Sequence, residues 1–202
     1  MMTLLLFIKH RCPGIWRLVE RANGHLFALR YPHVGQAVSE VLPCSRDEFE
    51  FSTVTADDIA PLSAFLNRQP AERLEYFAPH PFDAKTLTRL HRNRAFILMK
   101  ITHRPDGTLA GYFFLRCFFV GKAFHGLIAD SRFSGRGLGK AMWALSAQIC
   151  RRAGLRMQAT VSEHNPASLN SARKATEVTL IGKLSGGYLR IECKTRKDET
   201  AL

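Results

Sequence analysis

The stretch "RFSGRGLGKAMW", residues 132–143, places three glycines in five positions at the start of a helical pattern. Gly135, Gly137 and Gly139 carry no Cβ, so the backbone there can approach a ligand closely. The apolar positions that follow recur at helical spacing, namely Leu138, Met142, Leu145 and Ile149. A strand, a glycine-rich turn and a helix N-terminus together predict that backbone N–H groups bind an anion such as a diphosphate.

The spacing of these glycines excludes two common nucleotide motifs. A dinucleotide fingerprint needs Gly-x-Gly-x-x-Gly in the first strand-to-helix turn, whereas this stretch has Gly-x-Gly-x-Gly deep in the chain. A P-loop needs Gly-x-x-x-x-Gly-Lys followed by Ser or Thr. Here Ser134 occupies the place of the first glycine and Ala141 follows Lys140. We therefore expect a different phosphate-containing ligand.

The charge of the chain also favours an anionic ligand or partner. Its 202 residues contain 29 lysines and arginines against 17 aspartates and glutamates, a formal net charge of +12. This excess attracts nucleotides, phosphorylated small molecules, nucleic acids and membrane surfaces, and it does not choose among them. The compact basic cluster "RLHRNRAF", residues 89–96, is interpreted as the solvated end of a helix, where cations are favoured.

Cysteine usage and hydropathy indicate a cytoplasmic protein. The five cysteines are widely spaced without a Cys-x-x-Cys pair, so we expect free thiols and no metal site. The N-terminal "MMTLLLFIKHR" lacks the features of a signal peptide and is interpreted as a buried strand. No apolar segment is long enough to predict a transmembrane helix.

The first part of the chain, residues 1–47, predicts a small β-α-β-α extension. Its strands are expected at residues 3–9 and 25–31, and its helices at 13–24 and 33–42. Gly24 is expected to end the first of these helices. A polar stretch near residue 47 marks the boundary with a second part, residues 48–202.

The second part predicts an α+β domain rather than a regular β-α alternation. Strands are expected at residues 49–55, 95–103, 108–120, 123–130, 155–161, 178–184 and 188–194. Helices are expected at residues 56–69, 71–77, 83–93, 138–153 and 166–175. The predicted class is a mixed layer of strands and helices.

Two segments in order carry a family resemblance. The glycine stretch is followed by "VSEHNPASLNSARKA", residues 161–175, in which Asn165 caps a helix that begins at Pro166. With this order and spacing, the chain resembles the GNAT superfamily of N-acetyltransferases over about residues 49–194. The resemblance implies a mixed, mostly antiparallel central sheet flanked by helices, the acyl-CoA N-acyltransferase fold.

The family's acyl-CoA signature is Gln/Arg-x-x-Gly-x-Gly/Ala, directly after the fourth core strand. "SGRGLG" matches it with Gly137 and Gly139, although Ser134 stands where Gln or Arg is usual. A frame shifted to Arg132 and Gly135 also matches. The resemblance implies acetyl-CoA as co-substrate, bound by Ala129, Ser134, Gly135, Arg136, Gly137, Leu138, Gly139, Lys140, Asn165 and Ser168.

The resemblance also implies direct attack of an amine on the thioester of acetyl-CoA. We expect His125 to accept the proton of the ammonium, because imidazole titrates near neutral pH, with Asp130 as a second candidate. Glu163 and His164 are expected to contact the acceptor. The tyrosine and the glutamate that many members use are missing, since Ala172 and Ala123 stand near those positions.

The resulting hypothesis is an N-acetyltransferase that acts on a primary amine of a small acceptor. The basic character of the chain favours an anionic acceptor, for example an amino sugar nucleotide. A second hypothesis is acetylation of protein N-termini or lysines. A third is a non-catalytic module that binds CoA or nucleic acid. We expect a small-molecule acceptor as partner, no membrane association and a possible homodimer, while a nucleic-acid partner is the less favoured interpretation.

Overall fold

The computed structural model describes residues 13–196, with side chains from residue 18 onward. Its α-helices are α2 (Pro13–Arg30), α3 (Val34–Ser39), α4 (Ile59–Asn67), α5 (Ala71–Leu74), α6 (Ala84–His91), α7 (Leu138–Arg152) and α8 (Pro166–Ala175). Its strands are β1 (Cys44–Arg46), β2 (Phe49–Thr53), β3 (Phe96–His103), β4 (Thr108–Phe118), β5 (Lys122–Ala129), β6 (Arg156–Ser162), β7 (Thr176–Leu184) and β8 (Tyr188–Thr195). A short 3-10 helix, η1 (Ser131–Phe133), follows β5.

The strands form one sheet in the order β1-β2-β3-β4-β5-β6-β8-β7. Every neighbouring pair is antiparallel except β5 and β6, which are parallel and joined through α7. A parallel pair needs such a crossover, because a short turn cannot return the chain to the same end of the sheet. The prediction of a mixed, mostly antiparallel sheet flanked by helices is confirmed.

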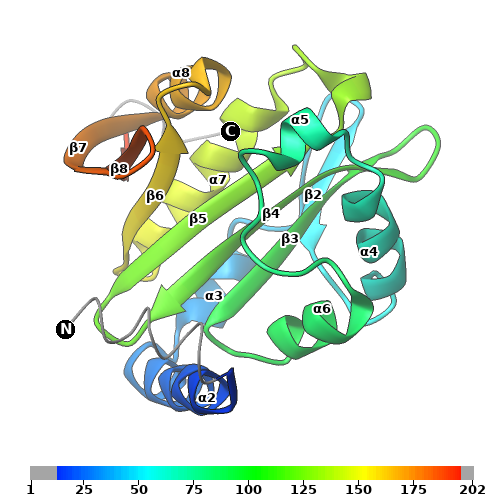
Figure 1. Cartoon of the computed structure of the whole chain (residues 1–202). Coiled ribbons are helices and arrows are strands. Elements are labelled where there is room, and N and C mark those ends of the chain that lie inside the picture. Colours follow the sequence, from blue (N-terminus) through cyan, green and yellow to red (C-terminus); the bar gives the residue numbers. More distant parts are fainter. Residues whose placement is uncertain (1–12, 197–202) are drawn as a thin grey trace.

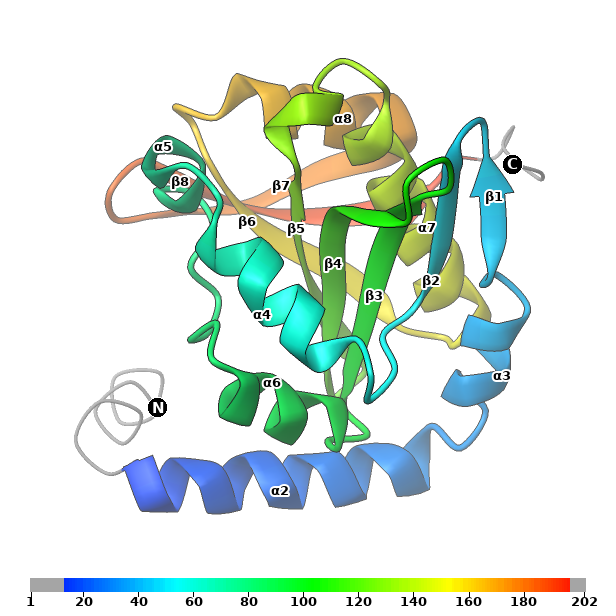
Figure 2. The ribbon, with the colours of Figure 1, turned by 90° about the vertical axis from the view of Figure 1, so that its right-hand side faces the viewer.

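Helices cover both faces of the sheet, with α4 and α6 on one face and α7 on the other (Figures 1 and 2). Successive side chains of β4 alternate between the two cores, as the pleat of a strand requires. Phe113 and Leu115 belong to the core that includes Trp143 of α7. Tyr112 and Phe114 belong to the core that includes α4 and α6. No helix in the described part of the chain is long and apolar enough to cross a bilayer.

The N-terminal extension differs from its prediction. Residues 13–30 form the single helix α2, so the strand expected at 25–31 is wrong and Gly24 does not end a helix. Gly24 is buried where α2 passes the turn after α6, and a Cβ there would lie 2.5 Å from Asn93 Oδ1. This glycine therefore permits close packing of two segments. The strand expected at residues 3–9 lies outside the described residues.

α2 is attached to the hairpin of β4 and β5 by specific contacts. Asn23 Nδ2 donates to the carbonyl of Cys117 at 3.0 Å, and Asn23 Oδ1 accepts from Phe119 N at 3.2 Å. Glu20 and Arg116 form an ion pair at 3.0 Å. Phe27 is fully buried in the core on the α7 side of the sheet. Figure 2 shows α2 along the end of the sheet away from the start of α7. The boundary near residue 47 remains a prediction.

Replacing Phe27 with alanine tests whether α2 folds with the rest of the chain. Phe27→Ala is expected to lower the free energy of unfolding by about 3–5 kcal/mol, because it empties a filled core position. Leu29→Ala on the same helix is the control, since Leu29 is 79% exposed. We expect the control to change stability by no more than about 0.5 kcal/mol. Urea unfolding measures both, and equal effects would show that α2 is not part of the core.

Candidate functional site

The parallel strands β5 and β6 pair over only three positions. Lys122, Ala123 and Phe124 face Arg156, Met157 and Gln158, respectively, and no ladder pair follows among the described residues. Figure 1 shows the two strands starting side by side and separating toward their carboxyl ends. The backbone groups of residues 125–129 that point toward this gap therefore lack a partner on β6. An extended ligand placed in the gap could form hydrogen bonds with these backbone N–H and C=O groups.

The glycine loop lies at the carboxyl end of β5, beside this gap. Gly135 and Gly137 have φ of +79° and +77°, values that favour glycine. A Cβ at either residue would meet no protein atom within 4 Å, so the space in front of the loop is open.

The start of α7 completes the anion site. Gly137 is the N-cap of α7, and the carbonyl of Gly137 accepts from Ala141 N at 3.0 Å. Lys140 lies in this first turn and is half-buried. The first N–H groups of an α-helix have no carbonyl four residues earlier within the helix and point out of its N-terminus. This arrangement can bind a phosphate group.

Gly139, the third glycine of the stretch, has a packing role. A Cβ on Gly139 would lie 3.2 Å from Ser171 Oγ of α8, so this glycine permits the close approach of α7 and α8. Leu138, the first residue of α7, is buried in the core. Asn165 caps α8, with Oδ1 accepting from Ser168 N at 3.1 Å. The direct contact of Asn165 and Ser168 with CoA stays a prediction.

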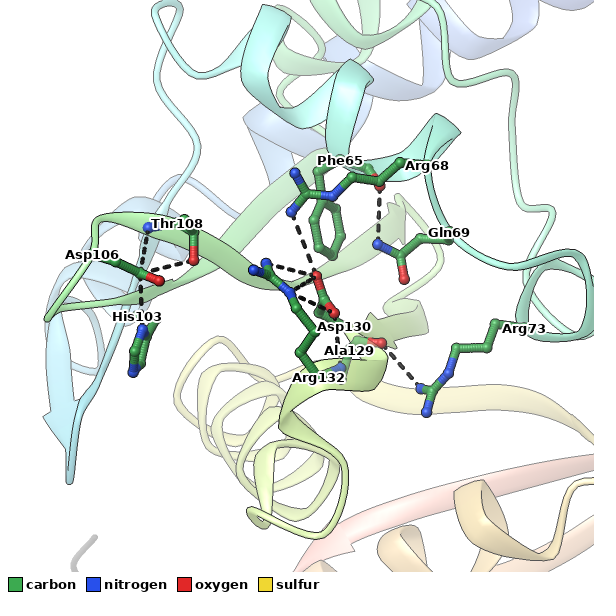
Figure 3. Close-up of polar contacts among 10 residues, drawn as sticks. All are labelled: Phe65, Arg68, Gln69, Arg73, His103, Asp106, Thr108, Ala129, Asp130 and Arg132. Atoms are coloured by element: carbon green, nitrogen blue, oxygen red, sulfur yellow. Dashed lines mark hydrogen bonds and ion pairs between the residues drawn. The ribbon is translucent and has the colours of Figure 1, made fainter.

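Asp130 lies at the end of β5 as a buried, doubly paired carboxylate. Its Oδ2 is 3.0 Å from Arg132 Nη2 and 3.5 Å from Arg68 Nη2, and its Oδ1 accepts from Arg132 N at 2.9 Å (Figure 3). Burial opposes ionisation, but the hydrogen bonds from Arg132 prevail and lower the pKa of Asp130. This carboxylate holds the turn that leads to the loop, and its pairing makes it a poor proton acceptor.

His125 points into the core between the sheet and α7. Its ring lies 4.4 Å from the ring of Trp143, centroid to centroid, and the residue is 6% exposed. Neither ring nitrogen reaches a partner with good hydrogen-bond geometry among the described residues. Burial lowers the pKa of His125 to about 3. These features do not suit a base that exchanges protons with a bound acceptor, so the geometry does not favour the predicted role of His125.

The positive charge expected at Arg136 is paired with a carboxylate. Arg136 Nη2 lies 2.6 Å from Glu48 Oε2, and its guanidinium stacks over the ring of Phe49. Another arginine contacts the start of the loop. Arg73 of α5 donates from Nη1 to the carbonyl of Ala129 at 3.1 Å and from Nη2 to Ser134 Oγ at 2.7 Å.

Glu163 and His164 are exposed in the turn between β6 and α8. Glu163 N donates to the carbonyl of Gly187 at 2.8 Å, and Lys183 lies 3.5 Å from the Glu163 carboxylate. His164 also borders the turn between β7 and β8, because a Cβ on Gly187 would lie 3.4 Å from its Nε2. Both residues thus lie at the carboxyl end of β6, and their contact with an acceptor stays a prediction.

Sequence reasoning missed a polar network where β5 and β6 begin to separate. Gln158 of β6 donates to Glu192 Oε2 at 3.2 Å and accepts from Arg190 Nη2 at 3.0 Å. Arg190 also lies over the ring of Phe124 of β5, with its Cζ 5.4 Å from the ring centroid. These side chains face away from α7, since their strand neighbours Met157 and Ile191 belong to the core on the α7 side. The alternation of polar and apolar residues along β6 and β8 could have indicated that these polar side chains share one face of the sheet, but no sequence motif singled them out.

The network contains an unusual buried donor. Arg190 Nε is buried without a hydrogen-bond partner among the described residues. A buried guanidinium N–H without an acceptor is energetically costly. No group of three metal-ligating side chains occurs in the described part of the chain.

Comparisons with known proteins agree with this geometry. The model of the acetyltransferase (GNAT) family matches residues 62–175. A comparison with curated proteins finds no matching sequence. The fold is similar to the GNAT domain of PAT from S. lividans, with a TM-score of 0.61 and 21% identity over 71% of this chain and 89% of that chain.

Two further solved structures are similar in the same way. The ribosomal-protein-S5-alanine acetyltransferase of Vibrio fischeri has a TM-score of 0.65 and 12% identity over 77% of this chain and 97% of that chain. YncA of Salmonella typhimurium, a structure with acetyl-CoA, has a TM-score of 0.56 and 20% identity over 77% of this chain and 98% of that chain. Since the family match spans more than half of the 202 residues and carries the glycine loop, this protein belongs to the acetyltransferase (GNAT) family.

Proposed function

We propose that the chain transfers the acetyl group of acetyl-CoA to a primary amine of a small acceptor that binds on the α4 and α6 face of the sheet. Family membership makes the chain an acetyltransferase with acetyl-CoA as its acetyl donor. The observation that carries the proposal is the separation of β5 from β6 beside an open glycine loop. α7 covers the other face of this gap, which leaves the α4 and α6 face for the acceptor (Figure 2).

The residues that would hold the donor follow from the loop and the gap. The turn at Gly135 and Gly137 and the first N–H groups of α7 suit the diphosphate. The unpaired backbone of residues 125–129 suits the extended arm, and an N–H there suits the thioester carbonyl. Acetyl-CoA supplies an activated acetyl group when bound.

The acceptor must lose a proton before its nitrogen attacks, because an ammonium has no free electron pair. We assign this proton transfer to Glu192, directly or through water. Its carboxylate belongs to the network with Gln158, which pairs with Phe124 at the last position before β5 and β6 separate. Glu192 also lies on the face of the sheet that α7 leaves free.

The acceptor class is the finer part of the proposal. Proteins of this fold are named for a wide range of acceptors, including spermidine, an aminoglycoside and ribosomal protein L7/L12. For this chain, the net charge of +12 and the half-buried guanidinium of Arg190 on the face that α7 leaves free support an acceptor that carries an anionic group beside its amine. An amino sugar nucleotide combines both groups.

An amine panel tests the proposal. Release of the CoA thiol is measured with amino sugar nucleotides, simple amino sugars, polyamines and N-terminal peptides. We expect turnover with an amine that carries an anionic group, and thermal stabilisation by acetyl-CoA but not by nucleic acid. Absence of a thermal shift with acetyl-CoA would contradict the donor. Turnover confined to peptides would contradict the acceptor class.

Substitution of Gly137 tests the loop. Gly137→Ala is expected to weaken acetyl-CoA binding by about tenfold, equal to about 1.4 kcal/mol, because a methyl group enters the open space in front of the loop. Gly154→Ala is the matched control, since Gly154 also has a positive φ, +67°, and open surroundings but ends α7 at its far end. Both variants bear a similar backbone strain of about 1–2 kcal/mol. Calorimetry would contradict the assignment if both variants bound acetyl-CoA equally well.

Substitution of Glu192 tests the base. Glu192→Gln keeps an oxygen that accepts from Gln158 but removes the basic carboxylate, so kcat is expected to fall by about a hundredfold. The KM for acetyl-CoA should stay the same. Glu177→Gln, on the exposed part of β7, serves as the control for removal of a negative charge. Unchanged kcat in Glu192→Gln would exclude this residue as the base.

The pH dependence of stability tests whether His125 is inaccessible to protons. An unfolded histidine takes up a proton near pH 6.5, whereas burial lowers the pKa of His125 to about 3 in the folded chain. Between these values the unfolded state binds more protons, so stability falls as the pH falls. From pH 7 to pH 5 the wild type should lose about 2 kcal/mol more than His125→Met in urea unfolding. Parallel pH profiles would indicate a protonatable His125.

A further inference from the structure

We propose that Arg73 supplies a diphosphate-binding charge at the place where the family signature has Gln or Arg and this chain has Ser134. The inference rests on the proposed donor site and extends it to a residue of α5, 61 positions before Ser134. The family signature has Gln or Arg where this chain has Ser134. The structure brings a guanidinium to that place from another element.

The position of Arg73 is fixed by two hydrogen bonds. Nη1 donates to the carbonyl of Ala129 at 3.1 Å, and Nη2 donates to Ser134 Oγ at 2.7 Å. The side chain therefore spans from the last residue of β5 to the start of the loop, and Figure 3 shows it reaching Ala129 from α5. A serine hydroxyl at 134 leaves room for this guanidinium and accepts from it.

Arg73 differs from the other arginines of this region in its partners. Arg68 and Arg132 share the carboxylate of Asp130, and Arg136 is paired with Glu48. In residues 18–196, where side chains are described, no carboxylate lies within ion-pair distance of Arg73, and its two acceptors are neutral. Its positive charge is therefore compensated by no protein group of that region.

The alternative frame of the signature does not supply the charge either. In that frame the signature arginine is Arg132, whose guanidinium is bonded to Asp130 through both Nε and Nη2. In neither frame does the first residue of the signature thus offer a cation without a carboxylate partner.

The chemistry of guanidinium fits a diphosphate. Two of the five N–H donors of Arg73 are engaged with Ala129 and Ser134, so three remain. Arginine binds phosphate oxygens through two parallel hydrogen bonds with charge assistance. The donors of Arg73 and the N–H groups of the α7 first turn would then contact the diphosphate together.

The test removes the charge of Arg73 and restores it from within the loop. Arg73→Gln is expected to raise the KM for acetyl-CoA about tenfold or more and to leave kcat within about twofold, because the residue binds the donor and does not touch the reacting atoms. With S-acetylpantetheine, which has no diphosphate, Arg73→Gln and wild type should react alike. Arg89→Gln, at the exposed end of α6, removes the same formal charge and should change neither constant.

The double variant Arg73→Gln/Ser134→Arg is expected to recover most of the lost affinity, because arginine at 134 restores the signature of the family. Affinity for CoA measured by calorimetry provides a second readout, and urea unfolding verifies that each variant is folded. An unchanged KM in Arg73→Gln overturns the inference, as does an equal loss with S-acetylpantetheine or a double variant that recovers nothing. A wild type that does not bind CoA overturns the donor assignment as well, so the two failures are distinguishable.

Discussion

The loss of pairing between β5 and β6 after Phe124 and Gln158 determines what this molecule can do. Two parallel strands joined through α7 share three positions and then separate, so one edge of β5 presents backbone donors and acceptors with no protein partner. Such an edge inside a sheet is unfavourable unless another chain of atoms occupies it. The glycine loop follows the same strand and brings the N-terminus of α7 to the end of the gap. The separation of β5 and β6 therefore determines both the shape of the sheet and the position of the ligand site.

Several arginines lie around the gap, and they differ in whether a carboxylate pairs with them. Asp130 forms ion pairs with both Arg68 and Arg132 and thereby fixes the turn between β5 and the loop. Glu48 holds Arg136 at the outer side of the loop. Arg73 and Arg190 approach the gap from its two sides, one near the loop and one near the point where the strands separate. Arg73 and Arg190 are thus two guanidinium groups beside the gap that keep hydrogen-bond donors without a partner in the described part of the chain.

Local patterns predicted the elements well where packing and propensity agree. The alternation of residues 49–55 and the cap at Asn165 are local signals, and the structure has strand β2 and helix α8 there. Gly24 led to the wrong prediction that a helix ends there. The structure instead needs a glycine because α2 packs against Asn93, a contact between residues 69 positions apart in the sequence, 93 minus 24.

His125 shows a second limit of prediction from sequence. Period-two alternation predicts that a residue faces one side of a sheet, but it does not say which face α7 will cover. The site could be predicted at Gly135 and Gly137, whose turn is local, but not at Arg73, which reaches the loop only after the sheet has formed.

The close approach of α2 to the turn after α6 has an evolutionary consequence. Asn93 Oδ1 accepts from Ala95 N at 3.0 Å and occupies the space that a side chain at position 24 would need. A larger residue at either position forces a change at the other, so positions 24 and 93 should covary in descendants of this sequence. Such a pair links an N-terminal helix outside the matched family segment to the segment itself. Substitutions in α2 and in the matched segment would then be constrained together.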